Sequence, residues 1–332
     1  MTKQERRRDV LKQGLRLVGA ATWVSVSLPA VAQMQTSGNP FKRTDRYDDS
    51  YIFERKPFKW PDGKDVAVWV APAVEVWSID KFGSGPNIRP NSNNYSPDVW
   101  NYSWREYGIR VGIWRMADVF DEAGIKATIL LNSKVCEIFP KAVEEMNRRG
   151  WEFVGHGATN SQTVAGMDAD KERDMIREVV STIEKATGKR PRGWLGAGVV
   201  ETHNTPDLLA EEGFLYCGDW GNDDQPYPMK VKSGKLYSLP YTIDVNDGQL
   251  FARKGYTGDQ YYGVIMDHFE TLLREGKKRP SVVGLGVHPM LTGQPLRIKA
   301  LKRVITQLKK DRAVWFATGG EIVDAYRQAT GA

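Results

Sequence analysis

A histidine between two glycines, His156 in the stretch GHGATNSQ at 155–162, is the first residue that could carry chemistry. It follows an apolar run, and flanking glycines let a backbone turn tightly and approach a ligand. Four residues later, where a metal site would take a second imidazole, the chain has Asn160. The pattern leaves three interpretations open: a metal site, a metal site that has lost a ligand, or a turn that contains a histidine.

Two further ionisable residues stand at the ends of apolar runs. Glu75 follows VAVWVAPAV, and partial burial there would raise its pKa toward the range useful for a general base. His288 ends SVVGLGVH, and histidine can transfer protons near neutral pH. We expect Glu75 to act as the base for water, with His156 assisting, and His288 to act as the acid. The alternatives are a surface glutamate and a structural histidine.

Asp219 directly follows another apolar run, GFLYCG. A carboxylate that accepts a ring N–H fixes the tautomer of a functional histidine. We therefore expect Asp219 to be part of the catalytic site and to orient His156 or His288.

Aromatic residues and glycines supply the expected substrate contacts. Trp194 and Gly196 lie in RGWLGAG, where they could form a wall and a backbone donor for an oxyanion. Trp220 and Trp104 are expected to line the same pocket. The long segment 81–108, rich in Gly, Pro, Asn and aromatic residues, is interpreted as an aromatic lid over the site, because ordered loops of this length are usually functional.

The elements that must position these residues form a strand–helix alternation. Short, mostly apolar runs without strict alternation suit strands that are buried on both faces. Amphipathic segments with helix caps and glycine stops lie between them. This alternation predicts an α/β fold with a parallel sheet closed into a barrel, whose active groups lie at the carboxyl ends of the strands. The predicted strands are 66–74, 126–131, 151–157, 192–198, 213–218, 236–243, 281–288 and 313–319.

Length and composition are those of a soluble globular protein. The 332 residues could form one large domain or two ordinary ones, and 41% of them are hydrophobic and 27% charged. Much of the formal charge of +6 belongs to residues 1–32, which hold six basic and two acidic side chains. The remainder is close to neutral, so nucleic-acid binding is not expected.

The amino-terminal segment is typical of an export signal. Residues 1–32 have a basic start, an apolar middle and a small-residue end, and RRDVLK resembles the twin-arginine motif. The alternative is an uncleaved amphipathic helix. We expect the twin-arginine machinery to deliver the folded protein to the periplasm or the medium, with no stable membrane insertion after cleavage. Residues 33–64 are interpreted as a surface leader and residues 65–332 as the barrel domain.

Two cysteines, Cys136 and Cys217, are interpreted as ordinary core residues. They could pair in an oxidising compartment, but sequence does not show whether they lie within reach of each other.

The residues above also resemble those of a known family over roughly 64–328. The chain is similar to the polysaccharide deacetylase (NodB-homology) superfamily, and within it to the branch of the PuuE-type allantoinases and cyclic-amide hydrolases. This resemblance implies a distorted (β/α)7–8 barrel and hydrolysis of a carbon–nitrogen bond other than a peptide bond. The segments that carry it are SWREYGIRVGIWRMADVF, GWEFVGHG, TGKRPRGWLG, TPDLLAEEGFLY, DWGNDDQPY, LPYTIDVND and VHPMLTGQPLRI.

The sequence departs from this family at the metal site. The family pattern is Asp, His and His with the histidines spaced H-x3-H, whereas this chain offers Glu75, His156 and Asn160. An amide oxygen is a poor substitute for imidazole at zinc. We therefore expect that no metal is required and that Asn160 binds substrate or caps the loop. The alternative is a divalent ion such as zinc on these three residues.

The sequence as a whole predicts an exported hydrolase of a linear or cyclic amide. One alternative is an N-deacetylase of polysaccharide or peptidoglycan in the cell envelope, whose substrate would be an N-acetylated glycan. Another is a non-catalytic periplasmic protein that binds a ligand or glycan on the same fold. Family relatives often form homo-oligomers, an analogy that leaves the number of subunits open.

Overall fold

A computed structural model describes residues 43–89 and 94–332, and the expected export signal at 1–32 lies outside these ranges. Asp45–Ala332 form one compact unit. Residues 45–64, part of the expected surface leader, belong to the same compact unit as the expected barrel domain. Trp60 is buried, and Arg46 and Arg55 form ion pairs with Asp207 and Asp223, so the described part of the leader packs on the domain.

A curled sheet of nine strands forms the centre of this unit, and it confirms the predicted distorted barrel. The strand order is β6-β7-β5-β4-β3-β2-β1-β8, and β9 pairs with β1. The pairings are parallel except that of β6 with β7. The strands are β1 (Val66–Val74), β2 (Thr128–Leu131), β3 (Glu152–Gly155), β4 (Gly193–Trp194), β5 (Tyr216–Cys217), β6 (Tyr227–Met229), β7 (Leu236–Ser238), β8 (Ser281–Val287) and β9 (Val314–Phe316).

Among the described residues no pairing joins β8 to β6, so the barrel is open there. Each of the eight predicted strands exists, although β4 and β5 have only two residues each. The strand β6 was not predicted. It is partly exposed and pairs antiparallel, which is why it lacks a fully apolar run.

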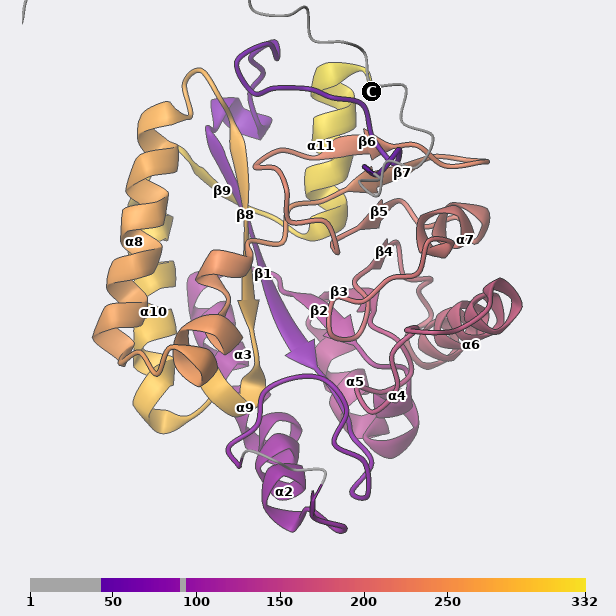
Figure 1. Cartoon of the computed structure of the whole chain (residues 1–332). Helices are drawn as coiled ribbons and strands as arrows, with labels where there is room; N and C mark the ends of the chain where they lie inside the picture. Colours follow the sequence, from indigo (N-terminus) through magenta and orange to yellow (C-terminus); the bar gives the residue numbers. More distant parts are fainter. Residues whose placement is uncertain (1–42, 90–93) are drawn as a thin grey trace, which may run out of the picture. The chain divides into compact units, whose positions relative to one another are not determined.

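Helices and helical turns connect the strands and pack around the sheet (Figure 1). Those in the first half are η1 (Pro61–Gly63), α2 (Val99–Tyr107), η3 (Gly108–Gly112), α3 (Ile113–Ala123), α4 (Lys134–Ile138), α5 (Pro140–Arg148) and α6 (Ala169–Thr187). Those in the second half are α7 (Thr205–Glu211), η4 (Ile243–Val245), η5 (Gly248–Arg253), α8 (Gly258–Glu275), α9 (Pro289–Thr292), α10 (Pro295–Lys310) and α11 (Gly319–Thr330).

Local signals explain where the long helices begin and end. Asp168 caps α6 by accepting from the backbone N–H of Lys171, and Gly188 ends it in the left-handed conformation with φ 72°. Capping boxes begin α8 at Thr257 and α11 at Thr318. These signals let the sequence set the helix boundaries before tertiary packing contributes.

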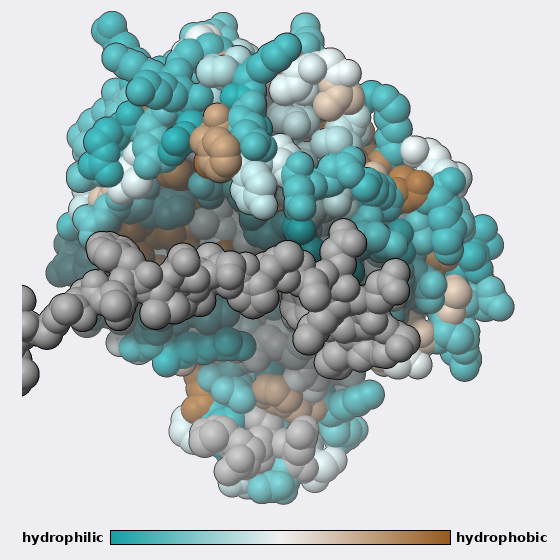
Figure 2. Space-filling view, turned by 45° about the horizontal axis from the view of Figure 1, so that its top comes forward, coloured by the Kyte–Doolittle hydropathy of each residue, from teal (hydrophilic) through white to brown (hydrophobic). Residues whose placement is uncertain are grey.

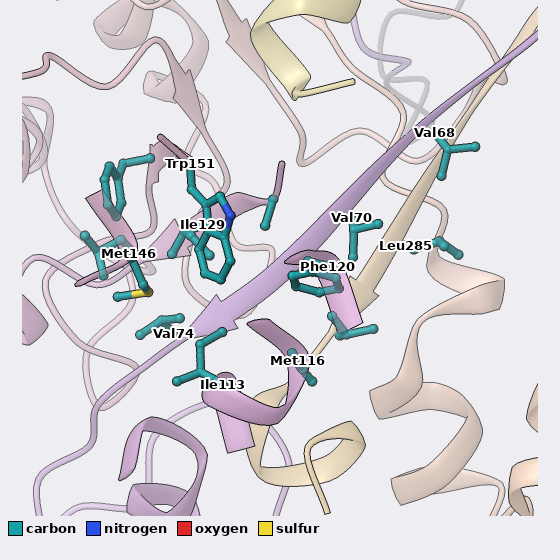
Figure 3. Packing of buried hydrophobic residues seen from close by; sticks show 14 of the residues in the cluster. Val68, Val70, Val74, Ile113, Met116, Phe120, Ile129, Met146, Trp151 and Leu285 are labelled. Carbon is teal, nitrogen blue, oxygen red and sulfur yellow. The ribbon is translucent and has the colours of Figure 1, made fainter. Parts of the chain in front are cut away.

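The main core lies between the sheet and the helices that cover it (Figure 3). Val70 and Val74 of β1 meet Ile113 and Phe120 of α3 there, and all four side chains are buried. Burying apolar side chains is the dominant favourable term in folding, so this layer holds β1 in place. Cys136 and Cys217 are both buried and unpaired, which confirms their interpretation as core residues.

The face seen in Figure 2 is mainly hydrophilic, with apolar side chains scattered among polar ones. No helix within the described ranges combines the length and the apolar character that a membrane span requires.

Candidate active site

Three ionisable side chains meet at the carboxyl ends of three strands. Glu75 follows β1, His156 follows β3 and His288 follows β8. The strand β1 pairs in parallel with β8 over Val66–Pro72 and with β2 over its last residues, and β2 pairs in parallel with β3. The arrowheads of β1 and β8 accordingly point the same way in Figure 1. The topology therefore brings together residues that lie more than 200 positions apart in sequence.

Glu75 is the centre of this group and is buried, with 6% of its surface exposed. Its Oε1 lies 3.2 Å from Nε2 of His156 and accepts a hydrogen bond from the side-chain amide of Asn160. Its Oε2 lies 4.0 Å from Nε2 of His288 and has no hydrogen-bond partner among the described residues. One carboxylate oxygen is thus fully engaged, and the other is available to a bound molecule.

The pKa of Glu75 differs from the expected direction. Burial alone raises it, as the sequence suggested, but the hydrogen bond from His156 and the charges of His288 and His156 outweigh burial and lower the pKa below its usual value. The expectation of a raised pKa was therefore wrong. Glu75 is ionised at neutral pH because two imidazoles and an amide surround it.

A backbone carbonyl, not a carboxylate, orients His156. Its Nδ1 hydrogen-bonds to the carbonyl oxygen of Leu195, so Nδ1 carries a proton. Nε2 then faces Glu75 and can donate to it only as an imidazolium. Both side chains of this pair are buried.

Asp247 orients His288. Its Oδ1 lies 2.6 Å from Nδ1 of His288, and its Oδ2 accepts from the backbone N–H of His288 and from the hydroxyl of Thr292. Burial lowers the pKa of His288, but the charges of Asp247 and Glu75 and the hydrogen bond to Asp247 raise it to about 9. His288 is therefore an imidazolium at neutral pH, with its Nε2–H directed toward the available oxygen of Glu75.

A cavity of about 420 Å³ opens beside these groups. Glu75, His156 and His288 lie on its lining together with Asn160, which the sequence suggested as a substrate contact. Its other walls come from the loop 84–87, the turn after β4, and residues 241–253 around η4 and η5. Its volume is that of a pocket for a small molecule.

The structure places Asp219 and Gly196 elsewhere than expected. Asp219 Oδ1 accepts from the backbone N–H of Gly196 at 2.8 Å, so it contacts neither imidazole and leaves that N–H unavailable to an oxyanion. Cys217 lies 3.2 Å from Glu201 and 3.3 Å from Asp219. Burial raises the pKa of Asp219 well above its usual value, and the nearby charge of Glu201 raises it further. Asp219 therefore supports the turn that carries Leu195, behind the cavity wall.

The three tryptophans also lie away from the cavity lining. Trp194 is fully buried with its ring against Gly155 of β3, because the short strand β4 turns this side chain into the core. Trp220 donates to Glu201 and meets Tyr47 edge to face. Trp104 lies within α2 and packs on the main core. Their expected role as pocket walls was therefore wrong.

The expected aromatic lid is instead a small polar loop. Part of 81–108 forms the helix α2, and the part that lines the cavity is Ser84–Asn87. Ser84 N–H donates to the backbone oxygen of Asn160 at 2.7 Å. Arg105 of α2 holds the loop from below by donating to the carbonyl oxygens of Phe82 and Pro86, at 3.0 and 3.1 Å. The loop is thus held by hydrogen bonds at Ser84 and at Pro86.

The residues at the family's metal position do not fit a metal ion. Asn160 presents its Nδ2, a hydrogen-bond donor, to Glu75, and its Oδ1 accepts from Asn132 at 3.1 Å. A cation would need lone pairs directed at it, and the third position supplies an N–H instead. A second group of ligand types, Glu201, Cys217 and Asp219, has ligand atoms within 4.8 Å of one another, but these groups already hydrogen-bond to each other.

Sequence reasoning missed Asp247 and Asn132. Asp247 lies in LPYTIDVND, one of the segments that carry the family resemblance, but it lies between the helical turns η4 and η5 and not at a strand end. Asn132 directly follows β2, the position that singled out Glu75 and His288. A search for all polar residues directly after the predicted strands, and not only the ionisable ones, would have found Asn132.

Comparisons with known proteins confirm the resemblance. The family model described as polysaccharide deacetylase matches residues 106–216. A putative polysaccharide deacetylase of Schizosaccharomyces pombe is 29% identical over 238 residues, which is 67% of this chain and 74% of that protein. A peptidoglycan deacetylase of Helicobacter pylori is 24% identical over 250 residues, 65% of this chain and 84% of that protein.

Two solved structures share the fold. PuuE allantoinase has a TM-score of 0.76 and 27% identity, covering 85% of this chain and 98% of that one. A probable polysaccharide deacetylase of Pseudomonas aeruginosa PAO1 has a TM-score of 0.75 and 27% identity, covering 81% and 93%.

Proposed function

Because the chain matches the polysaccharide deacetylase family in sequence and shares its fold with an allantoinase and a deacetylase, we propose that it is a hydrolase of carbon–nitrogen bonds other than peptide bonds. Its substrate is a small linear or cyclic amide. The observation that carries this proposal is the meeting of an ionised Glu75 and a protonated His288 at one cavity, with 4.0 Å between Oε2 and Nε2.

The two groups are in complementary protonation states for amide hydrolysis. Glu75 Oε2 has no other hydrogen bond and accepts the proton of a water that attacks the carbonyl carbon. His288 Nε2–H donates a proton to the leaving nitrogen, and Asp247 stabilises the imidazolium before the transfer. His156 and Asn160 hold Oε1 and so direct Oε2 to the water. No step requires a metal ion.

The size of the cavity supports a small substrate. A volume of about 420 Å³ suits a compact amide, and the loop 84–87 closes one side of it. A polymer chain would need an extended groove on either side of the reacting group.

A second candidate function is N-deacetylation of a glycan. It is favoured by the named relatives, which include polysaccharide and peptidoglycan deacetylases. The chemistry would again be hydrolysis of an amide, so the same side chains would serve. Only the substrate separates the two candidates.

A substrate panel distinguishes them. Purified protein, with its metal content measured by elemental analysis, is incubated with allantoin, hydantoins, cyclic imides and linear amides, and in parallel with N-acetylated chitooligosaccharides and peptidoglycan fragments. We expect turnover of a member of the first group by protein that contains far less than one equivalent of zinc.

Other results would lead to different conclusions. Acetate released only from the glycans would establish the deacetylase. Ligand-induced thermal stabilisation without turnover, with or without added zinc, would establish a binding protein. Activity that disappears with chelation and returns with zinc would contradict the acid–base mechanism.

We also propose that the protein is exported through the twin-arginine machinery, on the basis of residues 1–32. Two cysteines that are both buried and unpaired fit this route, because it carries proteins that have already folded and needs no disulfide formed after export.

A further inference from the structure

Asn132 lies under the group of Glu75, His156 and Asn160 and contacts the loops that carry them. It follows β2, the strand between β1 and β3, and its surface is fully buried. Its side chain makes three hydrogen bonds. Oδ1 accepts from the backbone N–H of Val76 at 2.9 Å, and Nδ2 donates to the backbone oxygen of His156 and to Oδ1 of Asn160.

These partners fix the orientation of the Asn132 amide. A backbone N–H can only donate, so the atom facing Val76 must be the oxygen. A backbone carbonyl can only accept, so the atom facing His156 must be the nitrogen. Both constraints give the same orientation, and neither depends on distinguishing oxygen from nitrogen in the amide itself.

The orientation of Asn132 in turn fixes that of Asn160. Because Asn132 presents an NH₂ group, the atom of Asn160 that faces it must be Oδ1. Nδ2 of Asn160 is then directed at Oε1 of Glu75. The backbone of Asn160 is also held, since its N–H donates to Val76 and its oxygen accepts from Ser84. These backbone hydrogen bonds hold the loop around Asn160 in place, so a loop movement does not change which partners its side-chain amide meets.

We propose that Asn132 is a positioning residue that fixes which end of the Asn160 side-chain amide faces Glu75. Asn132 thereby directs the NH₂ group of Asn160 at Glu75, and this hydrogen-bond donor excludes a cation from the space between the two side chains. The inference rests on the proposed function for its kinetic consequence, but the orientation itself can be measured without a substrate. On this proposal, Asn132, which is not one of the three residues at the family's metal position, is the reason why that position does not suit a metal ion.

The substitution Asn132→Asp tests whether Asn132 orients Asn160 and, through it, Glu75. An aspartate has nearly the same shape and keeps an oxygen for the Val76 N–H. Its ionised second oxygen can only accept, so it loses the hydrogen bond to the backbone oxygen of His156 and can bond only to an N–H of Asn160. Asn160 then satisfies it by turning its NH₂ toward residue 132 and its Oδ1 toward Glu75. The matched control is Asn147→Asp, because Asn147 also donates its side-chain amide to a backbone carbonyl, that of Thr187, away from the cavity.

Three measurements test whether Asn132 fixes the orientation of the Asn160 amide. In Asn132→Asp we expect kcat to fall on the order of 100-fold with KM changed less than about threefold, because Glu75 loses its orientation and the cavity keeps its shape. Zinc affinity, measured by equilibrium dialysis, should rise at least about tenfold because the third position now offers an oxygen. In wild type, the side-chain amide protons of Asn160 should be protected from exchange with water and shifted by the Glu75 carboxylate in NMR spectra.

The outcomes separate this inference from the proposed function. Protected Asn160 amide protons in wild type, whose chemical shifts change in Asn132→Asp but not in Asn147→Asp, support the proposed orientation even if no amide on the panel is turned over. A folded Asn132→Asp variant with unchanged zinc affinity and the wild-type Asn160 signal would overturn it. If that variant does not fold, free exchange of the Asn160 amide protons in wild type would overturn it, and their protection would support it.

Discussion

Glu75 has one engaged oxygen and one free oxygen, and this difference defines its expected role. Oε1 is held by His156 and Asn160, whereas Oε2 is buried without a hydrogen-bond partner among the described residues. A buried carboxylate oxygen without a partner costs free energy unless a ligand satisfies it. Such a cost is expected where binding and catalysis require it.

The substitution Glu75→Gln removes this acceptor while keeping the shape of the side chain. We expect kcat to fall by about 10²–10⁴-fold, the usual contribution of a positioned acid–base group, with little change in KM. Steady-state kinetics on the best amide of the panel would measure it. Retention of kcat within about threefold would remove Glu75 from the role of general base.

The acid limb and the alkaline limb of activity depend on different residues. His288 must be protonated to act as the acid, so activity should be lost as pH rises through about 9, the pKa to which Asp247 and Glu75 raise it against the effect of burial. Glu75 must be ionised, so its lowered pKa puts the acid limb below the usual range of a glutamate.

Asp247→Asn should move the alkaline limb to lower pH. The substitution removes a charge that stabilises the imidazolium, so the pKa of His288 falls toward its ordinary value of 6.5 and less of the acid form remains at pH 8. We expect a shift of at least about one pH unit in the profile of kcat. An alkaline limb that does not move in this variant would mean that another group sets it.

At the scale of single residues, the sequence predicted the positions of Glu75, His156 and His288 but not their environments. Their positions follow from the strand ends, which short apolar runs reveal. The direction of the Glu75 pKa depends on distances to two imidazoles from other strands, which no local pattern contains. Trp194 was misplaced for a similar reason, because the sequence does not show which face of a two-residue strand meets the core.

The loop 84–87 and the helix α2 act as one element. Arg105 is buried and stacks over Trp77 and Phe82, with its guanidinium carbon 4.3 and 4.5 Å from the ring centres. It donates to the carbonyl oxygens of Pro86, within the loop, and of Phe82, just before it. Burial lowers the pKa of Arg105 to about 10 against the charges of Glu75 and Asp98, so it remains a cation at neutral pH.

Arg105→Lys should loosen this wall of the cavity. Lysine keeps the charge but cannot make both hydrogen bonds or stack in the same way. We expect KM to rise about tenfold with a smaller change in kcat, corresponding to ~1.4 kcal/mol of binding free energy. Arg148→Lys, on the exposed surface of α5, is the matched control. Equal kinetics in the two variants would show that the loop does not depend on Arg105.

The elements themselves were the most predictable part of the molecule. Parallel strands buried on both faces leave continuous apolar runs, and caps such as Thr257 and Thr318 mark helix starts within a few residues. The opening between β8 and β6 was not predictable, because it depends on how strongly the whole sheet curls.

For the whole molecule, the sequence predicts where the protein acts. The segment 1–32 contains the pair Arg7 and Arg8, followed by Leu11 and Lys12, in the order of a twin-arginine signal. Replacing both arginines of the pair by lysine should retain the precursor inside the cell, whereas Arg6→Lys should not. Immunoblots of periplasmic and cytoplasmic fractions would show this, and equal export of both variants would contradict the assigned route.

The pairing of β1 with β8 joins Val66 to Ser281. A ribosome must therefore synthesise almost the entire polypeptide before Glu75 and His288 can meet, because the contact between them spans most of the chain. No fragment that ends before residue 288 contains both Glu75 and His288. The two side chains therefore come together only when synthesis is nearly finished.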